Sequence, residues 1–227
     1  MIISHKYRYI FIKTGKTAGT SIEIALSKYA GPADVITPCT VEDDLLRAQL
    51  GYVGPQNYHL PIRRYSLGMI ANSLFARRRV AYFNHMGAES IRRLVGRQIW
   101  SAYYKFCFER NPWDKVVSAY YYDVADPAIL SISDYIRGGA CDYLPGAKLY
   151  TIRGEVAVDE IFQFESLDKA MLTVAHRVGL PETPSLPRAK AQFRPPDRHY
   201  REVLSEGDKQ EIGRIYAKEI ATFGYQW

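Results

Sequence analysis

Two stretches of the sequence each combine a strand-like segment, a short loop and an amphipathic helix. In the first, aromatic and aliphatic residues alternate with polar ones over Tyr7–Lys13, and a helix is predicted at Thr20–Tyr29 with Thr20 and Ser21 as its caps. In the second, a buried strand is predicted at Tyr103–Phe108, and Asn111-Pro112 then begins a helix. Because strands that alternate with helices favour parallel pairing, we expect an α/β fold with a mostly parallel sheet between helices.

The rest of the chain fits a single domain that spans residues 1–227. Its composition is that of an ordinary globular protein, with 47% hydrophobic and 24% charged residues. An irregular excursion is expected at about 30–62, where glycine, proline and polar residues gather, and a basic, proline-rich segment at about 181–200. Further predicted elements are helices at 66–79, 88–95, 167–178 and 205–223 and a short strand at Val80–Asn84.

Charge is concentrated in two parts of the chain. Residues 61–115 hold 11 Lys or Arg against 3 Asp or Glu, and residues 188–201 hold 5 against 1, although the net charge is only +6. Such segments favour an anionic partner: a nucleotide, a nucleic acid or an acidic polymer.

The sequence contains neither an apolar run of about 18 residues nor a signal peptide. We therefore expect a cytoplasmic protein without a membrane span, whose mature chain starts at Met1 and whose three cysteines are reduced.

The loop between the first predicted strand and helix has the sequence KTGKTAGTS, from Lys13 to Ser21. Small residues let the backbone approach an anion closely, the N–H groups at the helix start are available to it, and Lys16 adds a positive charge. We expect a phosphate or sulfate there. Only the last three positions of the Walker A pattern are present, since Ile10 occupies the place of its first glycine, which argues against an ordinary ATPase or GTPase.

The second loop and helix have the sequence FERNPWDKVVSAYYY, which begins at Phe108. Arg110 follows the end of a predicted central strand, and Ser118 lies two turns along the polar face of the helix, which also carries Lys115. An arginine fork together with a hydroxyl group is a good receptor for a phosphate monoester. The alternative is an ordinary amphipathic helix in which Arg110 pairs with Asp114.

Taken together, these motifs resemble the sulfotransferase family, specifically its carbohydrate-type, uronyl 2-O-sulfotransferase-like branch. Further similarity lies in HMGAESIRRLVG at 85–96, in QFESL at 163–167 and in the ending HYREVL…IYAKEIATFGYQW, so the resemblance covers most of the chain. It implies a three-layer, P-loop-like α/β fold and the donor 3′-phosphoadenosine 5′-phosphosulfate (PAPS). Two positions depart from the family pattern: Gly15 stands where proline is common, and Glu109 where valine is common.

The resemblance also implies roles for individual residues. The 5′-phosphosulfate would be held by Lys16, Thr17, Ala18, Gly19, Thr20 and Ser21, and the 3′-phosphate by Arg110 and Ser118. Lys16 would also neutralise the leaving phosphate oxygen, and because a sulfuryl group carries a single negative charge, no metal is expected. His85 is the candidate base for the acceptor hydroxyl, with Glu165 as a weaker alternative.

The acceptor is expected to be a hydroxyl of a carbohydrate or glycoconjugate, and the basic residues of 61–97 are compatible with an acidic saccharide. Arg188, Lys190, Arg194 and Arg198 either complete the 3′-phosphate pocket, attract an anionic acceptor or belong to a solvated loop. Two other functions fit parts of the pattern. One is a P-loop-like nucleotide kinase; the other is a nucleic-acid-binding module, although the sequence contains no recognisable nucleic-acid reader motif and we expect no such partner.

Overall fold

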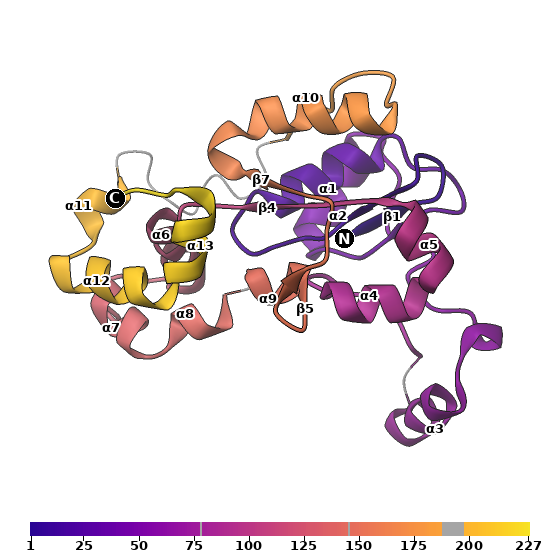
Figure 1. Ribbon diagram of the computed structural model, residues 1–227, viewed down its shortest axis with the longest axis horizontal. Coiled ribbons are helices and arrows are strands. Elements are labelled where there is room, and N and C mark those ends of the chain that lie inside the picture. Colours follow the sequence, from indigo (N-terminus) through magenta and orange to yellow (C-terminus); the bar gives the residue numbers. More distant parts are fainter. Residues whose placement is uncertain (78, 145, 188–197) are drawn as a thin grey trace.

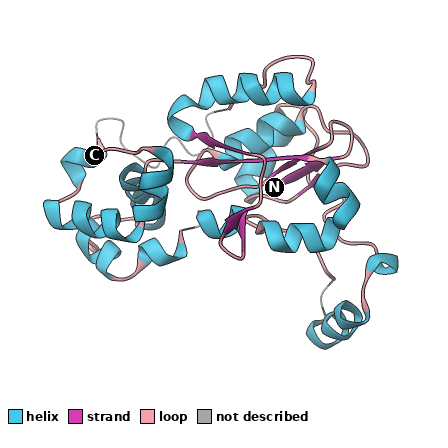
Figure 2. Cartoon of the chain, viewed as in Figure 1, coloured by secondary structure: helices cyan, strands magenta, loops and turns pink. Residues whose placement is uncertain are grey.

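A five-stranded sheet forms the centre of the protein in the computed structural model, which describes residues 1–77, 79–144, 146–187 and 198–227 (Figures 1 and 2). The strand order is β3-β1-β2-β4-β7. Strands β2, β4 and β7 are parallel, whereas β1 is antiparallel to both β2 and β3. The strands span Ile2–Ser4 (β1), Tyr9–Phe11 (β2), Val35–Ile36 (β3), Tyr104–Glu109 (β4) and Glu160–Gln163 (β7).

The mixed sheet corrects the expected fold class, a three-layer P-loop-like fold around a mostly parallel sheet. The expectation is wrong because it overlooked β1, which a tight turn at residues 5–8 joins to β2 as an antiparallel hairpin. The short β3 then adds to the outer side of β1, also antiparallel. A three-residue strand gives almost no alternation to detect, so pattern analysis misses it.

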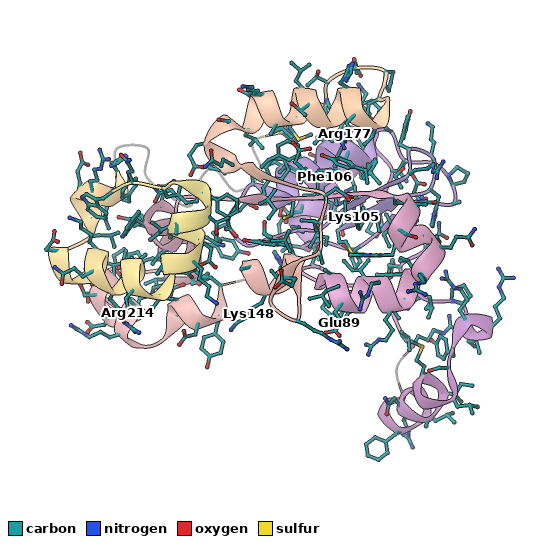
Figure 3. All side chains as sticks on the ribbon, viewed as in Figure 1. Glu89, Lys105, Phe106, Lys148, Arg177 and Arg214 are labelled. Atoms are coloured by element: carbon teal, nitrogen blue, oxygen red, sulfur yellow. The ribbon has the colours of Figure 1, made fainter. Side chains whose placement is uncertain are left out.

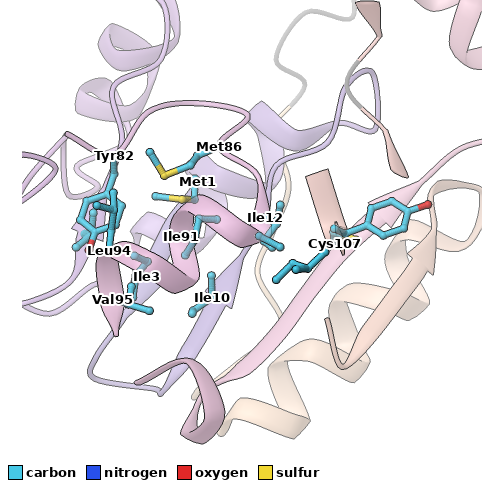
Figure 4. Packing of buried hydrophobic residues seen from close by; sticks show 14 of the residues in the cluster. Met1, Ile3, Ile10, Ile12, Tyr82, Met86, Ile91, Leu94, Val95 and Cys107 are labelled. Carbon is cyan, nitrogen blue, oxygen red and sulfur yellow. The ribbon is translucent and has the colours of Figure 1, made fainter. Parts of the chain in front are cut away.

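Helices cover both faces of the sheet. On one face, Tyr9 and Phe11 pack with residues of α1 (Gly19–Ser27) and α10 (Leu167–Val178). On the other, Ile10 packs against α4 (Ala88–Val95); Figure 4 shows this cluster from close by. Successive residues of β2 thus enter opposite cores, as the alternation of side chains in a strand requires.

A third core lies in a lobe of helices beside the sheet, to the left in Figure 1. Trp113, Val116, Val117 and Tyr120 bury one face of α6 (Pro112–Asp123) in this core, as the sequence predicts. The other helices of this lobe are α7 (Ile132–Arg137), α8 (Ala140–Tyr143), α11 (Tyr200–Val203), α12 (Glu206–Ile215) and α13 (Ala217–Phe223).

Most predicted helices are confirmed, and α4 and α10 have the predicted bounds. The predicted helix at 205–223 is two helices, which meet at Tyr216. The predicted strand at Val80–Asn84 is only an isolated bridge between His59 and Ala81. The excursion at 30–62 contains β3 and the helix α2 (Val41–Gln49), which Thr40 caps. The remaining elements are η1 (Ile62–Arg64), α3 (Leu67–Ala76), α5 (Arg97–Ala102), α9 (Ala147–Tyr150), β5 (Thr151–Ile152), β6 (Glu155–Val156) and η2 (Phe164–Ser166).

Two expectations from composition can be compared with the structure. All three cysteines are free thiols, as predicted. Within the described part of the chain, no helix has both the length and the apolar character that crossing a bilayer requires.

Candidate functional site

A pocket of about 880 Å³ lies where the parallel strands β2 and β4 end. The loop after β2, the start of α1, and α6 after β4 contribute to its walls. The structure thereby brings together all nine residues that the sequence and the resemblance single out. These residues are Lys16, Thr17, Ala18, Gly19, Thr20, Ser21, His85, Arg110 and Ser118.

The loop between β2 and α1 is fixed to the neighbouring strand. Thr14 donates a hydrogen bond to the carbonyl of Phe108 on β4 at 2.5 Å, and its hydroxyl lies 2.9 Å from that of Thr17. Lys16 and Ala18 both adopt the left-handed conformation, with φ of 59° and 56°. Non-glycine residues adopt this conformation at an energetic cost, so the surrounding contacts must hold the loop in place.

Helix α1 begins without a side-chain cap, which corrects the expectation that Thr20 and Ser21 cap it. Its N-cap is Ala18, which has no polar side chain, and the helix starts at Gly19. The first N–H groups of a helix have no partner within the helix and carry its partial positive charge. Because Gly19, Thr20 and Ser21 line the pocket, this end of the helix faces it and favours an anionic ligand.

A buried ion pair supports the loop from behind. Lys13 Nζ lies 3.0 Å from a carboxylate oxygen of Glu23 on α1, and both side chains are at least 95% buried. Burial alone would lower the pKa of Lys13. The interactions of its ammonium with the carboxylate of Glu23 and with Cys39 have the larger effect, so the pKa of Lys13 is raised and the side chain stays charged. Gly19 is required beside it, because a Cβ at Gly19 would lie 2.7 Å from Lys13 Cγ.

Arg110 connects the two halves of the pocket. Its guanidinium pairs with Asp114 at 2.5 Å, which is the arrangement of the ordinary amphipathic helix, and it also donates to the carbonyl of Lys16 at 3.0 Å. The guanidinium lies over the ring of Phe164, 4.2 Å from its centroid. Ser118 is half-buried on the same helix and lines the pocket. Arg110 therefore fixes the position of the loop as well as adding charge.

The unusual Glu109 has a structural partner. Its carboxylate pairs with Lys115 at 2.6 Å, and both side chains are at least 98% buried. Tyr150 donates a further hydrogen bond to Glu109 at 3.2 Å. The expectation that Lys115 lies on an exposed polar face is thus wrong, because Lys115 turns inward to neutralise this carboxylate. The negative charge of Glu109 beside the anion pocket is thereby offset.

His85 is held in one tautomer by the start of the loop. Its Nδ1 lies 2.9 Å from the backbone carbonyl of Lys13. A carbonyl can only accept, so Nδ1 donates the proton and Nε2 keeps its lone pair. Burial, together with the positive charge of Lys13, lowers the pKa of His85 to about 4. His85 is therefore neutral at pH 7.

Neither of the other candidate residues that the structure describes is found in the pocket lining. The alternative base, Glu165, is exposed, accepts a hydrogen bond from the backbone N–H of Asn111 at 2.7 Å, and is not among the residues lining the pocket. Arg198 is exposed and also lies outside the pocket lining. Arg188, Lys190 and Arg194 fall outside the described residues.

Four aromatic residues that the sequence did not single out line the pocket, Tyr122, Tyr135, Tyr143 and Phe164, and two of them face a cation. The ammonium of Lys16 lies over the ring of Tyr122, 3.8 Å from its centroid, and Phe164 faces Arg110 as described above. A cation over an aromatic face is attracted by the electron-rich ring. Tyr122 follows Ser118 by four residues, so helical spacing alone places both on one face. The position of Phe164 depends on the pairing of β7 with β4, which the sequence did not predict.

Across the described ranges, no group of three or more His, Cys, Asp or Glu side chains is arranged to hold a metal ion. No family model matches the chain. No solved structure matches it significantly. An uncharacterized protein of Archaeoglobus fulgidus is 38% identical to it over 102 residues, which make up 43% of this chain and 85% of the archaeal protein. The chain therefore belongs to the same family as that archaeal protein.

Proposed function

We propose that the protein is a sulfotransferase that moves a sulfuryl group from PAPS to a hydroxyl of a carbohydrate or glycoconjugate. One observation carries the proposal: the loop of residues 13–21 and the pair Arg110 and Ser118 line a single pocket. A volume of about 880 Å³ is in the range of sites for ligands of nucleotide size. The same two segments carry the motifs by which the chain resembles the carbohydrate-type sulfotransferases.

The charges of the pocket suit a donor with an anionic group at each end. Lys16 and the first turn of α1 would bind the 5′-phosphosulfate, since both present positive charge to it. Arg110 and Ser118 would bind the 3′-phosphate. Arg110 already uses part of its fork on Asp114 and on the loop carbonyl, so a phosphate would share this guanidinium with those two partners.

Transfer breaks the bond between sulfur and the bridging phosphate oxygen and forms a bond between sulfur and the acceptor oxygen. The charge that develops on the leaving phosphate would be stabilised by Lys16, and 3′,5′-ADP would be released. The acceptor proton would pass to Nε2 of His85, whose lone pair the hydrogen bond to Lys13 leaves exposed to a partner. By analogy with phosphoryl transfer, the transition state is loose and in line.

The test is an incubation with labelled PAPS and a panel of glycans, glycolipids and phenols, comparing the natural chain with Lys16→Ala. We expect label to appear in a hydroxyl-bearing acceptor and Lys16→Ala to lower the rate by roughly 10²–10³-fold, as for loss of one oxyanion donor. Lys148→Ala is the matched control, because Lys148 is exposed and outside the pocket lining (Figure 3). Transfer at the natural rate by Lys16→Ala would contradict the role of Lys16.

A binding measurement separates this proposal from the other two functions. A sulfotransferase binds 3′,5′-ADP tightly without magnesium and in preference to ADP. A nucleotide kinase prefers ADP or ATP with magnesium. A nucleic-acid-binding module retains RNA or DNA in a salt-sensitive way and does not respond to PAPS. Either of the last two results would overturn the proposal.

A further inference from the structure

The apolar face of helix α3 points away from the rest of the protein. The residues of this face follow the spacing i, i+3, i+4, i+7 and i+8, which places them on one side of a helix. They are Leu67, Ile70, Ala71, Leu74 and Phe75. All five are exposed, Leu67 by 88%, Leu74 by 75% and Phe75 by 95%.

The opposite side of α3 faces the rest of the chain. Met69 and Ser73 are half-buried, and Met69 packs against the core cluster that contains Ile91 and Leu94. In Figure 1, α3 projects from the body at the lower right. A surface helix normally buries its apolar face and exposes its polar one. The orientation of α3 is the reverse, so its apolar face is available to a partner.

The base of this projection is positively charged. Residues 61–88 contain five arginines and no aspartate or glutamate. Arg64 donates to the carbonyls of Leu94 and Val95 at 2.9 and 3.1 Å, which fastens the projection to the end of α4. A shallow groove at that end of α4 is lined by Glu89 and by three further arginines, Arg92, Arg93 and Arg97.

We propose that α3 docks the protein on the surface of an anionic phospholipid bilayer. Leu67, Leu74 and Phe75 would enter the boundary between headgroups and acyl chains, and the arginines at the base of the helix would meet the lipid phosphates. The charge distribution favours lipid over a second copy of this chain. Two copies that meet through this face would bring their arginines together without an acidic counterpart from residues 61–88. The proposal is independent of the sulfotransferase activity.

The test is flotation of the full chain with vesicles of phosphatidylcholine alone or with about 30% phosphatidylglycerol. We expect flotation with the mixed vesicles only, and a decrease as salt is added. Leu74→Ser/Phe75→Ser should lower binding at least tenfold, because the two apolar side chains that would enter the bilayer are lost. Arg77→Gln/Arg79→Gln should lower it roughly 25-fold, since each arginine near an anionic surface is worth roughly fivefold.

Matched controls use exposed residues elsewhere. Leu172→Ser on α10 and Arg214→Gln on α12 should bind like the natural chain; Figure 3 shows Arg214 in the helical lobe, far from α3. Thermal melting of each variant confirms that it is folded. Absence of flotation at low salt would overturn the proposal, as would equal binding by Leu74→Ser/Phe75→Ser. Self-association in sedimentation that this double variant abolishes, without vesicle binding, would identify a second copy as the partner instead.

Discussion

The titration of His85 offers a direct test of the pocket. Burial and the charge of Lys13 lower its pKa from 6.5 to about 4. A tenfold change in proton affinity corresponds to about 1.4 kcal/mol, so charging His85 costs about 3 kcal/mol more in the folded chain than in the unfolded one. Above pH 6.5 the residue is neutral in both states and has no effect. As the pH falls from 6.5 to 4, only the unfolded chain gains the proton, so the folded state loses stability.

The assay is urea denaturation of the natural chain and of His85→Gln at pH 7 and pH 5. Glutamine can keep a hydrogen bond to the carbonyl of Lys13 but does not titrate. Between these two pH values, the free energy of unfolding should fall by about 2 kcal/mol more in the natural chain than in His85→Gln. An equal fall in both proteins would refute the argument that burial holds His85 neutral.

Ligand binding should move the same pKa upward. One negative charge at roughly 8 Å, with an effective dielectric constant of about 20, stabilises the imidazolium by about 2 kcal/mol. In NMR titrations, saturation with 3′,5′-ADP should therefore raise the pKa of His85 from about 4 by roughly 1.5, if the pocket binds this nucleotide. The positive charge of His85 should then add to the affinity for the nucleotide. This contribution should be complete below pH 4 and should be lost as the pH rises above the raised pKa. An unchanged pKa would show that the anion binds away from His85.

Two further substitutions test how the site is supported. Lys115→Met leaves the carboxylate of Glu109 buried without its ion pair and should lower the free energy of unfolding, measured by urea denaturation, by about 3–5 kcal/mol. The double variant Glu109→Gln/Lys115→Met should recover most of this lost stability, because no buried charge is left unpaired. A double variant as unstable as the single one would contradict this account. Gly19→Ala forces a Cβ against Lys13 and should cost about 1–3 kcal/mol while weakening binding of 3′,5′-ADP by at least tenfold. Natural affinity and stability in Gly19→Ala would show that the loop tolerates the methyl group.

Helices with strong local signals were predictable from the sequence. Asn111 and Pro112 mark the start of α6, and the structure shows the Asn111 side chain accepting from the backbone N–H groups of Trp113 and Asp114. Strand β2 is likewise found within Tyr7–Lys13. In contrast, the two-residue strand β3 is defined by pairing with β1, a contact between distant residues. Local patterns carry little information about such pairings.

For the site, the sequence predicted which residues meet but not how their charges are balanced. Lys16 and Arg110 follow strands that pair in parallel, so their positions are set by two local motifs. The inward turn of Lys115 depends instead on Glu109, six residues earlier and across a strand end. A helical face assigned from spacing alone places Lys115 in solvent, because spacing contains no information about a buried carboxylate nearby.

The predicted fold class is wrong, yet the predicted pocket residues do come together, because the unexpected strands and the pocket lie on opposite sides of β2. The antiparallel strands β1 and β3 lie on one side of β2, whereas β4 and β7 lie on the other and run parallel to it. The loops that follow β2 and β4 therefore emerge at the same end of the sheet whatever is added beyond β1. Such neighbouring strand ends are where α/β sheets place their ligands. The site thus depends on the parallel pairing of β2 and β4, and not on the rest of the sheet.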